Sequence, residues 1–246
     1  MKMTVIGHWG AYPAKGEATS CYLIEEGDTK LILDCGSGAV SNLQNHLALK
    51  HLDGVIVSHT HADHVADLGV LAYSRLIDMQ LNHTHHRLNV YAHEDEETLH
   101  SELNKDPYSE CYPFVETDEL EFPDVTVQFC KGKHKVDSYG MKIISRETGK
   151  KMVYTADTSY TDQMAAFAKE ADLLLAECSF YQGQNGEQFG HMTSLDAGRL
   201  ASRGEVGELI LTHLPHFGDH AQLIEETRKV YVGRVSLASA GMSKTI

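Results

Sequence analysis

The stretch His59-Thr60-His61-Ala62-Asp63-His64 decides how this chain is interpreted. It directly follows the apolar run Val55-Ile56-Val57, which predicts a buried strand. Burial of imidazoles and a carboxylate without partners is costly, so such a group indicates either bulk water or a cation. Side chains two residues apart at a strand end point to the same side, so His59 and His61 can converge on one point. Asp63 and His64 fall where a helical pattern begins and can reach a second point. The spacing therefore favours a cation site over a polar loop with chance histidines.

Length and composition limit the class of protein. The 246 residues, 42% of them apolar, suit one domain over residues 1–246 with a substantial core. No apolar run approaches the roughly 20 residues that span a bilayer, and the first residues lack a signal-peptide pattern, so we expect no membrane association and a cytoplasmic location. The net charge of −14 disfavours non-specific nucleic-acid binding. Five scattered cysteines without a CxxC pair predict reduced thiols.

Short apolar runs alternate with helical patterns along the chain. The expected strands are Thr4–Gly7, Cys21–Glu25, Leu31–Asp34, Gly54–Ser58, Leu88–Ala92, Val125–Cys130, Gly140–Ser145, Met152–Thr155, Leu173–Ala176, Leu209–Thr212 and Val235–Ala238. The expected helices are Ala39–Lys50, His64–Asp78, Glu94–Leu103, Asp162–Lys169, Leu195–Ser202 and Ala221–Tyr231. Thr193 to Asp196 is a capping-box pattern, and Asp219 can cap the last helix. A mixed β-rich core with helices outside, of the α/β (α+β) class, fits this order.

Single polar residues follow several later strands. His134, Asp157 and His213 each come just after an apolar run. Each alone is more typical of a hydrogen-bonded strand end, but beside the cluster at residues 59–64 the repeated pattern favours metal ligands carried on loops at strand ends. The histidine-rich segment 82–87 is polar and is expected to be a solvated loop. Asp34 ends a strand and is expected to hydrogen-bond a ligand histidine or the backbone around the metal loop, without being a ligand.

The pattern His59-x-His61-x-Asp63-His64, with His134, Asp157 and His213 downstream, resembles the metallo-β-lactamase superfamily. The resemblance implies a four-layer αββα sandwich of two similar halves. It also implies two divalent cations, one held by His59, His61 and His134 and the other by Asp63, His64 and His213, with Asp157 bridging them. The all-nitrogen-and-oxygen ligand set suits Zn²⁺, with Mn²⁺ or Fe²⁺ as alternatives.

Within the superfamily the chain resembles ribonuclease Z, the ELAC-type tRNA 3′-processing enzyme. The matching segments are Leu31–Gly38, His134–Gly140, Val153–Thr158, Ala176–Phe180 and His191–Ser194. This resemblance makes Glu177 and His191 a candidate carboxylate–histidine relay, with a structural ion pair as the alternative, and suggests a homodimer. Only residues 135–156 separate His134 from Asp157, which is too short for the arm that grips tRNA in ribonuclease Z. We therefore expect a short phosphodiester, or another RNA, in place of tRNA.

These residues together predict metal-assisted hydrolysis. Asp63 is expected to accept a proton from the nucleophile, and His191, oriented by Glu177, to protonate the leaving oxygen or to stabilise charge on it. The leading hypothesis is a phosphodiesterase or ribonuclease of the ribonuclease Z type. The alternatives are a hydrolase of another small ester, thioester or lactone, a cyclic-nucleotide phosphodiesterase, and a non-catalytic binding protein.

Overall fold

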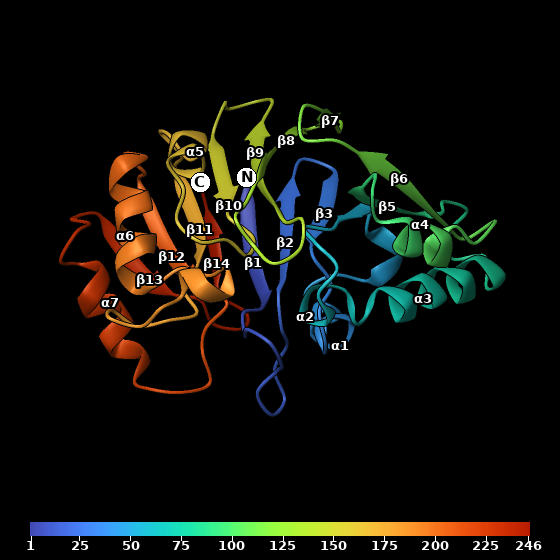
Figure 1. Ribbon diagram of the computed structural model, residues 1–246. Coiled ribbons are helices and arrows are strands. Elements are labelled where there is room, and N and C mark those ends of the chain that lie inside the picture. Colours follow the sequence, from blue (N-terminus) through green and yellow to red (C-terminus); the bar gives the residue numbers. More distant parts are fainter. The chain divides into compact units, whose positions relative to one another are not determined.

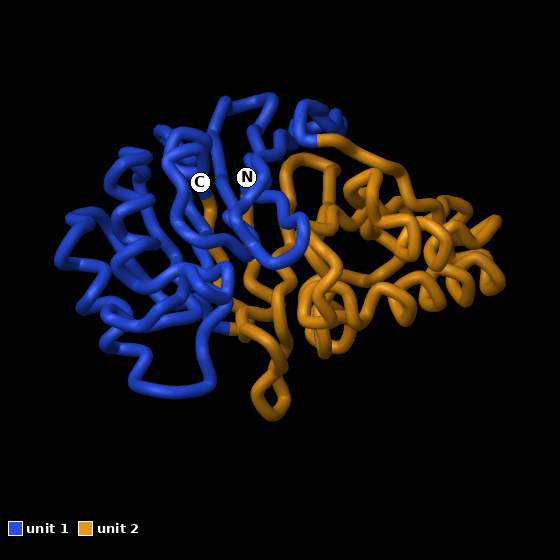
Figure 2. The backbone as a smooth tube through the Cα atoms, in the orientation of Figure 1, with its two compact units in different colours: residues 1, 116–239, 246 blue, residues 2–115, 240–245 orange.

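Two seven-stranded mixed sheets, each in a different unit of the chain, carry the fold (Figures 1 and 2). The computed structural model describes all residues 1–246. Unit 2 contains residues 2–115 and 240–245, and unit 1 contains residue 1, residues 116–239 and residue 246.

In unit 2 the strand order is β14-β1-β2-β3-β4-β5-β6. Neighbours from β14 to β3 are antiparallel, and those from β3 to β6 are parallel. The strands are β1 (Lys2–Gly7), β2 (Cys21–Glu26), β3 (Thr29–Leu33), β4 (Gly54–Ile56), β5 (Leu88–His93), β6 (Ser109–Phe114) and β14 (Ser243–Thr245). The helices are α1 (Ala39–Leu43), the 3₁₀ turn η1 (Leu49–His51), α2 (Ala62–Val65), α3 (Leu68–Gln80) and α4 (Glu97–Leu103).

In unit 1 the order is β13-β12-β11-β10-β9-β8-β7. Neighbours from β7 to β10 are antiparallel, and those from β10 to β13 are parallel. The strands are β7 (Glu119–Glu121), β8 (Val125–Lys131), β9 (Tyr139–Ser145), β10 (Lys151–Tyr154), β11 (Leu173–Glu177), β12 (Glu208–Thr212) and β13 (Arg234–Leu237). The helices are α5 (Asp162–Phe167), the 3₁₀ turn η2 (Glu187–Phe189), α6 (Ser194–Arg203) and α7 (His220–Thr227).

Both sheets follow one plan, in which antiparallel strands lead into three parallel pairings. The inner parallel strands β4, β10, β11 and β12 are nearly continuous apolar runs because side chains on both of their faces are buried, as in β11, where every residue is buried. The carboxyl ends of neighbouring parallel strands lie at one edge of a sheet, which is where loops can bring polar side chains together. The expected α/β class with two similar halves is therefore confirmed.

All of the expected strands form, with ends shifted by a few residues, and the strands that the sequence did not predict lie at sheet edges. These are β6, β7 and β14. Edge strands are commonly short, charged or interrupted by proline, because these features discourage pairing with other chains. Pro113 in β6 and the two glutamates of β7 have this character, and it hides the strand signal.

Two of the expected helices are wrong in extent. The expected helix Ala39–Lys50 is only the short α1 followed by η1, because Asn42 in the last turn of α1 and Asn45 after it are poor helix formers. The expected helix His64–Asp78 is broken between α2 and α3. There the Asp67 N–H donates to the Cys35 carbonyl at 3.1 Å, and the Asp67 carboxylate accepts from the Val40 N–H at 3.0 Å. The tertiary bonds of Asp67 thus replace helical ones.

Local signals elsewhere are confirmed. Thr193 and Asp196 form a capping box at α6, and the Asp219 carboxylate accepts from the Ala221 N–H at the start of α7. All five cysteines are free and buried, and burial raises the pKa of the Cys111 thiol to about 12. No helix has the length and apolar character needed to cross a membrane.

Arg75, on the inner face of α3, is almost fully buried and fixes several connections of unit 2. Its guanidinium donates to the carbonyls of Leu52 (2.7 Å), His86 (2.9 Å), Arg87 (3.1 Å) and Leu49 (3.3 Å). Arginine suits this position because its planar fork presents five N–H donors in fixed directions.

Replacement of this side chain by Arg75→Met should lower the free energy of unfolding by about 3 kcal/mol, because four carbonyls, that of Leu52 among them buried, lose a charged donor. Denaturant unfolding followed by the fluorescence of Trp9, the only tryptophan and a residue of unit 2, measures this loss. Arg199→Ala is the matched control, since Arg199 is exposed and pairs only with Asp196 at 3.5 Å; its cost should stay below about 0.5 kcal/mol. Equal costs for the two variants would refute this role of Arg75.

Candidate metal centre

The first cluster of candidate ligands lies in unit 2, in the loop that leaves β4 and at the start of α2. The His59 and His61 rings are 4.8 Å apart between centroids, and the His59 and His64 rings are 4.1 Å apart. The His59 Nε2 atom is 3.1 Å from the His61 Nδ1 atom. The short segment thus gathers three imidazoles at one place, as its spacing predicts.

Asp34 and Ser58 hold these rings from behind. The fully buried Asp34 carboxylate is 2.7 Å from the His64 Nδ1 atom, and it accepts from both the Ser58 N–H (2.7 Å) and the Ser58 hydroxyl (2.8 Å). The same hydroxyl lies 3.0 Å from the His59 Nδ1 atom. The predicted supporting role of Asp34 is confirmed.

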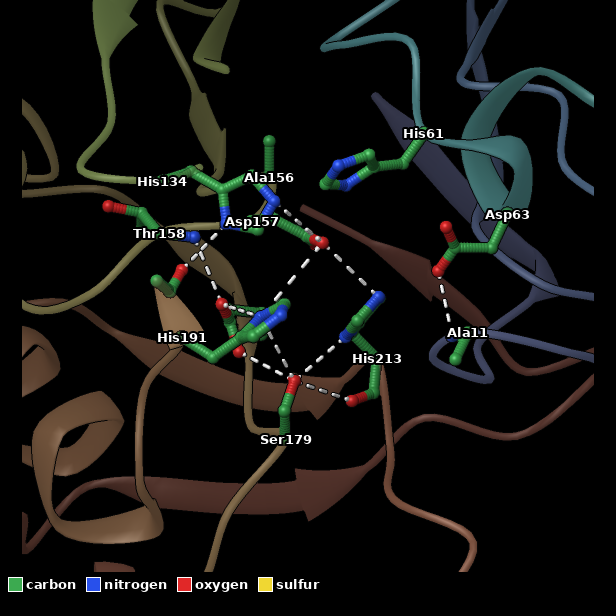
Figure 3. Close-up of polar contacts among 12 residues, drawn as sticks. Ala11, His61, Asp63, His134, Ala156, Asp157, Thr158, Ser179, His191 and His213 are labelled. Carbon is green, nitrogen blue, oxygen red and sulfur yellow. Dashed lines mark hydrogen bonds and ion pairs between the residues drawn. The ribbon is translucent and has the colours of Figure 1, made fainter. Parts of the chain in front are cut away.

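The Asp63 carboxylate is fixed by a backbone group that is distant in sequence. Its Oδ2 atom accepts from the Ala11 N–H at 2.7 Å, in the loop between β1 and β2 (Figure 3). The same oxygen lies 3.8 Å from the His64 Nε2 atom, which is too far for a hydrogen bond. The Asp63 Oδ2 atom is therefore bonded to the Ala11 N–H and not to the His64 Nε2 atom.

The second cluster lies in unit 1, beyond the carboxyl ends of parallel strands. Asp157 follows β10, Glu177 ends β11 and His213 follows β12. Ala156 and His213 adopt left-handed backbone conformations, with φ of 52° at each, and so does Asp34 in unit 2, with φ of 59°. Residues other than glycine adopt this conformation at a cost, so surrounding bonds must hold the turns that aim these side chains.

Asp157 is the centre of the second cluster. Its Oδ2 atom lies 3.4 Å from the His213 Nε2 atom, 3.9 Å from the His134 Nε2 atom and 4.0 Å from the His191 Nδ1 atom. Two atoms that each lie about 2.1 Å from one tetrahedrally coordinated ion are separated by about 3.4 Å. These separations are close to those of atoms that share a cation. Asp157, His191 and His213 together form a group able to bind a metal ion.

The hydrogen-bond partners of the Nδ1 atoms show whether the candidate ligands are oriented to bind a metal. The His134 Nδ1 atom donates to the Gly190 carbonyl at 2.8 Å, and the His213 Nδ1 atom is 2.8 Å from the Ser179 hydroxyl. With His59 and His64 held in the same way by Ser58 and Asp34, four rings have Nδ1 engaged by the protein. A ring held at Nδ1 presents the Nε2 lone pair, as histidine ligands of metals do. The donor set therefore fits one or more divalent cations.

Glu177, Ser179 and His191 form a hydrogen-bonded group beside Asp157. The buried Glu177 carboxylate lies 2.9 Å from the His191 Nδ1 atom and accepts from the Ser179 hydroxyl (2.8 Å) and the Thr158 N–H (2.9 Å). These bonds compensate for burial of the carboxylate. His191 is partly exposed and stacks on His213, with 5.4 Å between the ring centroids. The Nδ1 atom of His191 is therefore the nitrogen that Glu177 holds.

Each predicted site residue falls into one of these two clusters. Unit 2 carries His59, His61, Asp63 and His64; unit 1 carries His134, Asp157, Glu177, His191 and His213. The sequence did not reveal the roles of Ser58, Ser179 and Ala11, which act through hydrogen bonds. The position of Ser179 two residues after Glu177 could have indicated its role, because side chains two residues apart at a strand end share a face. The segment 82–87 is largely exposed, as expected.

Comparisons with known proteins agree with this geometry. A profile for the beta-lactamase superfamily domain matches residues 29–214. The chain is 41% identical over 241 residues to the probable metallo-hydrolase YhfI of Bacillus subtilis, with 98% of each chain covered. The crystal structure of that metallo-beta-lactamase fold protein matches 99% of this chain and 98% of its own with a TM-score of 0.96. Ribonuclease Z of Metallosphaera sedula is 23% identical over 94% of each chain. Human tRNase Z, short form (ELAC1), shares the fold with a TM-score of 0.77 at 20% identity, over 100% of this chain and 99% of its own.

Replacement of the carboxylate behind His64 by Asp34→Asn should weaken divalent-metal binding by about 10- to 100-fold, because the amide no longer fixes the tautomer and basicity of the ring. Metal retained during titration with a chelator measures the change. Asp53→Asn is the matched control, since the Asp53 carboxylate also accepts a backbone N–H, from Lys30 at 2.7 Å, but contacts no ligand histidine. Equal metal retention by both variants would contradict the assignment of Asp34.

Proposed function

Because the chain belongs to the beta-lactamase superfamily and has the metallo-beta-lactamase fold, we propose that this metallo-hydrolase is a phosphodiesterase of the ribonuclease Z type that acts on short substrates. The observation that carries the proposal is the Glu177–His191 pair beside Asp157. A histidine held at Nδ1 by a carboxylate is suited to deliver a proton from Nε2, which the departure of an alkoxide from phosphorus requires.

The donor chemistry supports a pair of metals. Both clusters contain imidazoles with engaged Nδ1 atoms and a carboxylate, and imidazole and carboxylate ligands suit Zn²⁺, with Mn²⁺ and Fe²⁺ as alternatives. We assign His59, His61 and His134 to one ion, Asp63, His64 and His213 to the other, and Asp157 to both. Bound divalent ions would supply Lewis-acid activation of water and of a phosphoryl oxygen.

Side chains of the protein accept and donate the protons of the hydrolysis. Asp63, whose Oδ2 atom accepts from the Ala11 N–H, is assigned to accept a proton from the attacking water. His191 gives its Nε2 proton to the leaving oxygen, while Glu177 stabilises the imidazolium before transfer. Ser179 bridges Glu177 and His213 and so keeps the orientation of the acid coupled to that of a ligand.

The segment between His134 and Asp157 supports a short substrate. It consists of β9 and β10 joined by a tight turn at residues 146–150, so it has no protruding arm. The net charge of −14 also disfavours a large folded polyanion. A short phosphodiester, such as an oligonucleotide end or a cyclic nucleotide, fits these features better than tRNA.

The leaving group should decide the effect of His191→Ala. Loss of a general acid should reduce kcat by about 10³-fold for a phosphodiester with an alkoxide leaving group, because an alkoxide must be protonated. For bis-p-nitrophenyl phosphate the loss should be at most about tenfold, because nitrophenolate leaves without a proton. Steady-state kinetics with both substrates measures the difference, and Glu177→Gln should show the same dependence in weaker form.

The exposed His85→Ala variant is the control and should retain wild-type rates. Metal content measured on the same samples separates two roles: His191→Ala should keep the ions, whereas a ligand variant should lose them. A uniform loss with both leaving groups would rule out the acid role of His191. Turnover of lactones or thioesters alone would replace the proposal by the corresponding esterase, and no turnover of any substrate would favour a binding protein.

A further inference from the structure

Phe189 is an exposed aromatic residue in a loop of unit 1 whose surface is otherwise polar. It lies in the segment 182–190, which follows β11 and contains η2. Phe189 is 51% exposed, and the other exposed residues of the segment are polar residues or glycine. A single exposed apolar residue is common on protein surfaces and carries no argument by itself. Its connections to the candidate metal centre give the Phe189 ring its significance.

The first connection is a stack of aromatic rings. The rings of Phe180 and Phe189 are nearly parallel, with an angle of 14° between their planes and 5.7 Å between their centroids. The Phe180 ring in turn lies 6.1 Å from the ring of His191, the proposed general acid. Phe180 therefore covers one face of the Phe189 ring and links it to the site, and the other face is exposed to solvent.

The second connection is the backbone at Gly190, directly after Phe189. The Gly190 carbonyl accepts from the His134 Nδ1 atom at 2.8 Å, and a Cβ atom at Gly190 would lie 2.8 Å from the same nitrogen. Gly190 also has a left-handed conformation, with φ of 82°. Glycine adopts this conformation readily and has no Cβ atom to clash with the ligand ring. The loop can thus pass close to His134, which places Phe189 one residue from a contact with a candidate ligand.

Hydrogen bonds fix the rest of the loop around Phe189. The Phe189 N–H donates to the Gly186 carbonyl at 2.9 Å, and the His191 N–H donates to the same carbonyl at 3.1 Å. The Glu187 carboxylate accepts from the Lys133 ammonium group at 2.5 Å. A ring on a loop held in this way loses little conformational freedom when a ligand covers it, so the contact contributes more of its energy to affinity.

The exposed face of Phe189 suits a flat and uncharged group. A phenyl ring offers no charge to a second phosphate, and the polar surface around it lacks the apolar walls that would enclose a lipid chain. A nucleobase has a π face that stacks on aromatic side chains. It also has polar edges that amides can bond, and Asn185 and Gln188 present amides in the same loop. The organic group that fits this surface is therefore a nucleoside.

We propose that Phe189 stacks the nucleobase of the substrate and so selects nucleoside phosphodiesters. This inference rests on the proposed function, which places the phosphate of the substrate at the metal centre beside His191. Stacking is tolerant of sequence because every base has a π face. We therefore expect Phe189 to distinguish a nucleoside from a bare sugar or from glycerol, and not one base from another.

Binding of monophosphates to the Zn²⁺-loaded chain tests the stacking without any turnover. Adenosine 5′-monophosphate should bind at least about tenfold more tightly than ribose 5-phosphate, which has the same sugar and phosphate but no base. In Phe189→Leu, which keeps an apolar side chain without a ring, the two dissociation constants should differ by less than about threefold. Phe189→Trp should keep the preference for the nucleotide. Isothermal titration calorimetry measures all of these constants.

Tyr73→Leu is the matched control, since it removes an aromatic ring that is 64% exposed in unit 2 and should leave the preference at its wild-type value. Proton NMR adds a signature that a structural role of Phe189 would not produce. The adenine H2 and H8 signals should move upfield on binding to the wild type, because of the ring current of Phe189, and should lose this shift with Phe189→Leu. Equal affinity of the wild type for the nucleotide and for ribose 5-phosphate would overturn the inference.

Steady-state kinetics separates failure of this inference from failure of the proposed function. Thymidine 5′-p-nitrophenyl phosphate and methyl p-nitrophenyl phosphate have the same leaving group, and only the first has a base. Phe189→Leu should raise KM for the nucleoside ester about tenfold more than KM for the methyl ester, and should change kcat little. Turnover of both esters with equal effects of the variant would refute the stacking and leave the phosphodiesterase proposal intact. Phe189-dependent nucleotide binding without turnover of any phosphodiester would support the stacking and refute the phosphodiesterase.

Discussion

Burial of imidazoles and carboxylates is the constraint on which the rest of the structure depends. His59, His64 and Asp157 are almost fully removed from water, where an isolated polar group costs several kcal/mol. The chain offsets part of this cost with protein hydrogen bonds at one nitrogen of each ring. The Asp157 carboxylate lies 3.4 to 4.0 Å from ring nitrogens of His213, His134 and His191, an arrangement that a divalent cation would stabilise.

The folded backbone meets this constraint by placing the polar groups at strand ends. Parallel strands β10, β11 and β12 bring Asp157, Glu177 and His213 to one sheet edge, although these residues are distant in sequence. Left-handed turns at Ala156 and His213 then aim the side chains. The sheet can hold such strained turns because its buried apolar strands are rigid. The parallel strands that form this part of the sheet therefore also position the site residues of unit 1.

The sequence predicted most of what depends on local patterns. The candidate ligands in residues 59–64 were predictable because strand-end spacing alone places His59 beside His61, and Asp157 and His213 were predictable as polar residues that directly follow apolar strands. Residues that act through tertiary contacts could not be predicted in this way. Ser179 contacts His213 and Ala11 contacts Asp63 only after folding, and Asp67 breaks a continuous helical pattern through bonds to another loop. The edge strands escaped prediction because polar sequences protect them from aggregation.

The two histidine–carboxylate clusters should hold divalent cations. This can be measured as equilibrium uptake of Zn²⁺ by the chelator-stripped chain, with bound metal quantified by mass spectrometry after dialysis. The chain should take up about two ions, and about one or fewer after Asp157→Ala, because that carboxylate is assigned to both. A stripped, folded chain that takes up no stoichiometric Zn²⁺, Mn²⁺ or Fe²⁺ would show that the clusters are not metal sites.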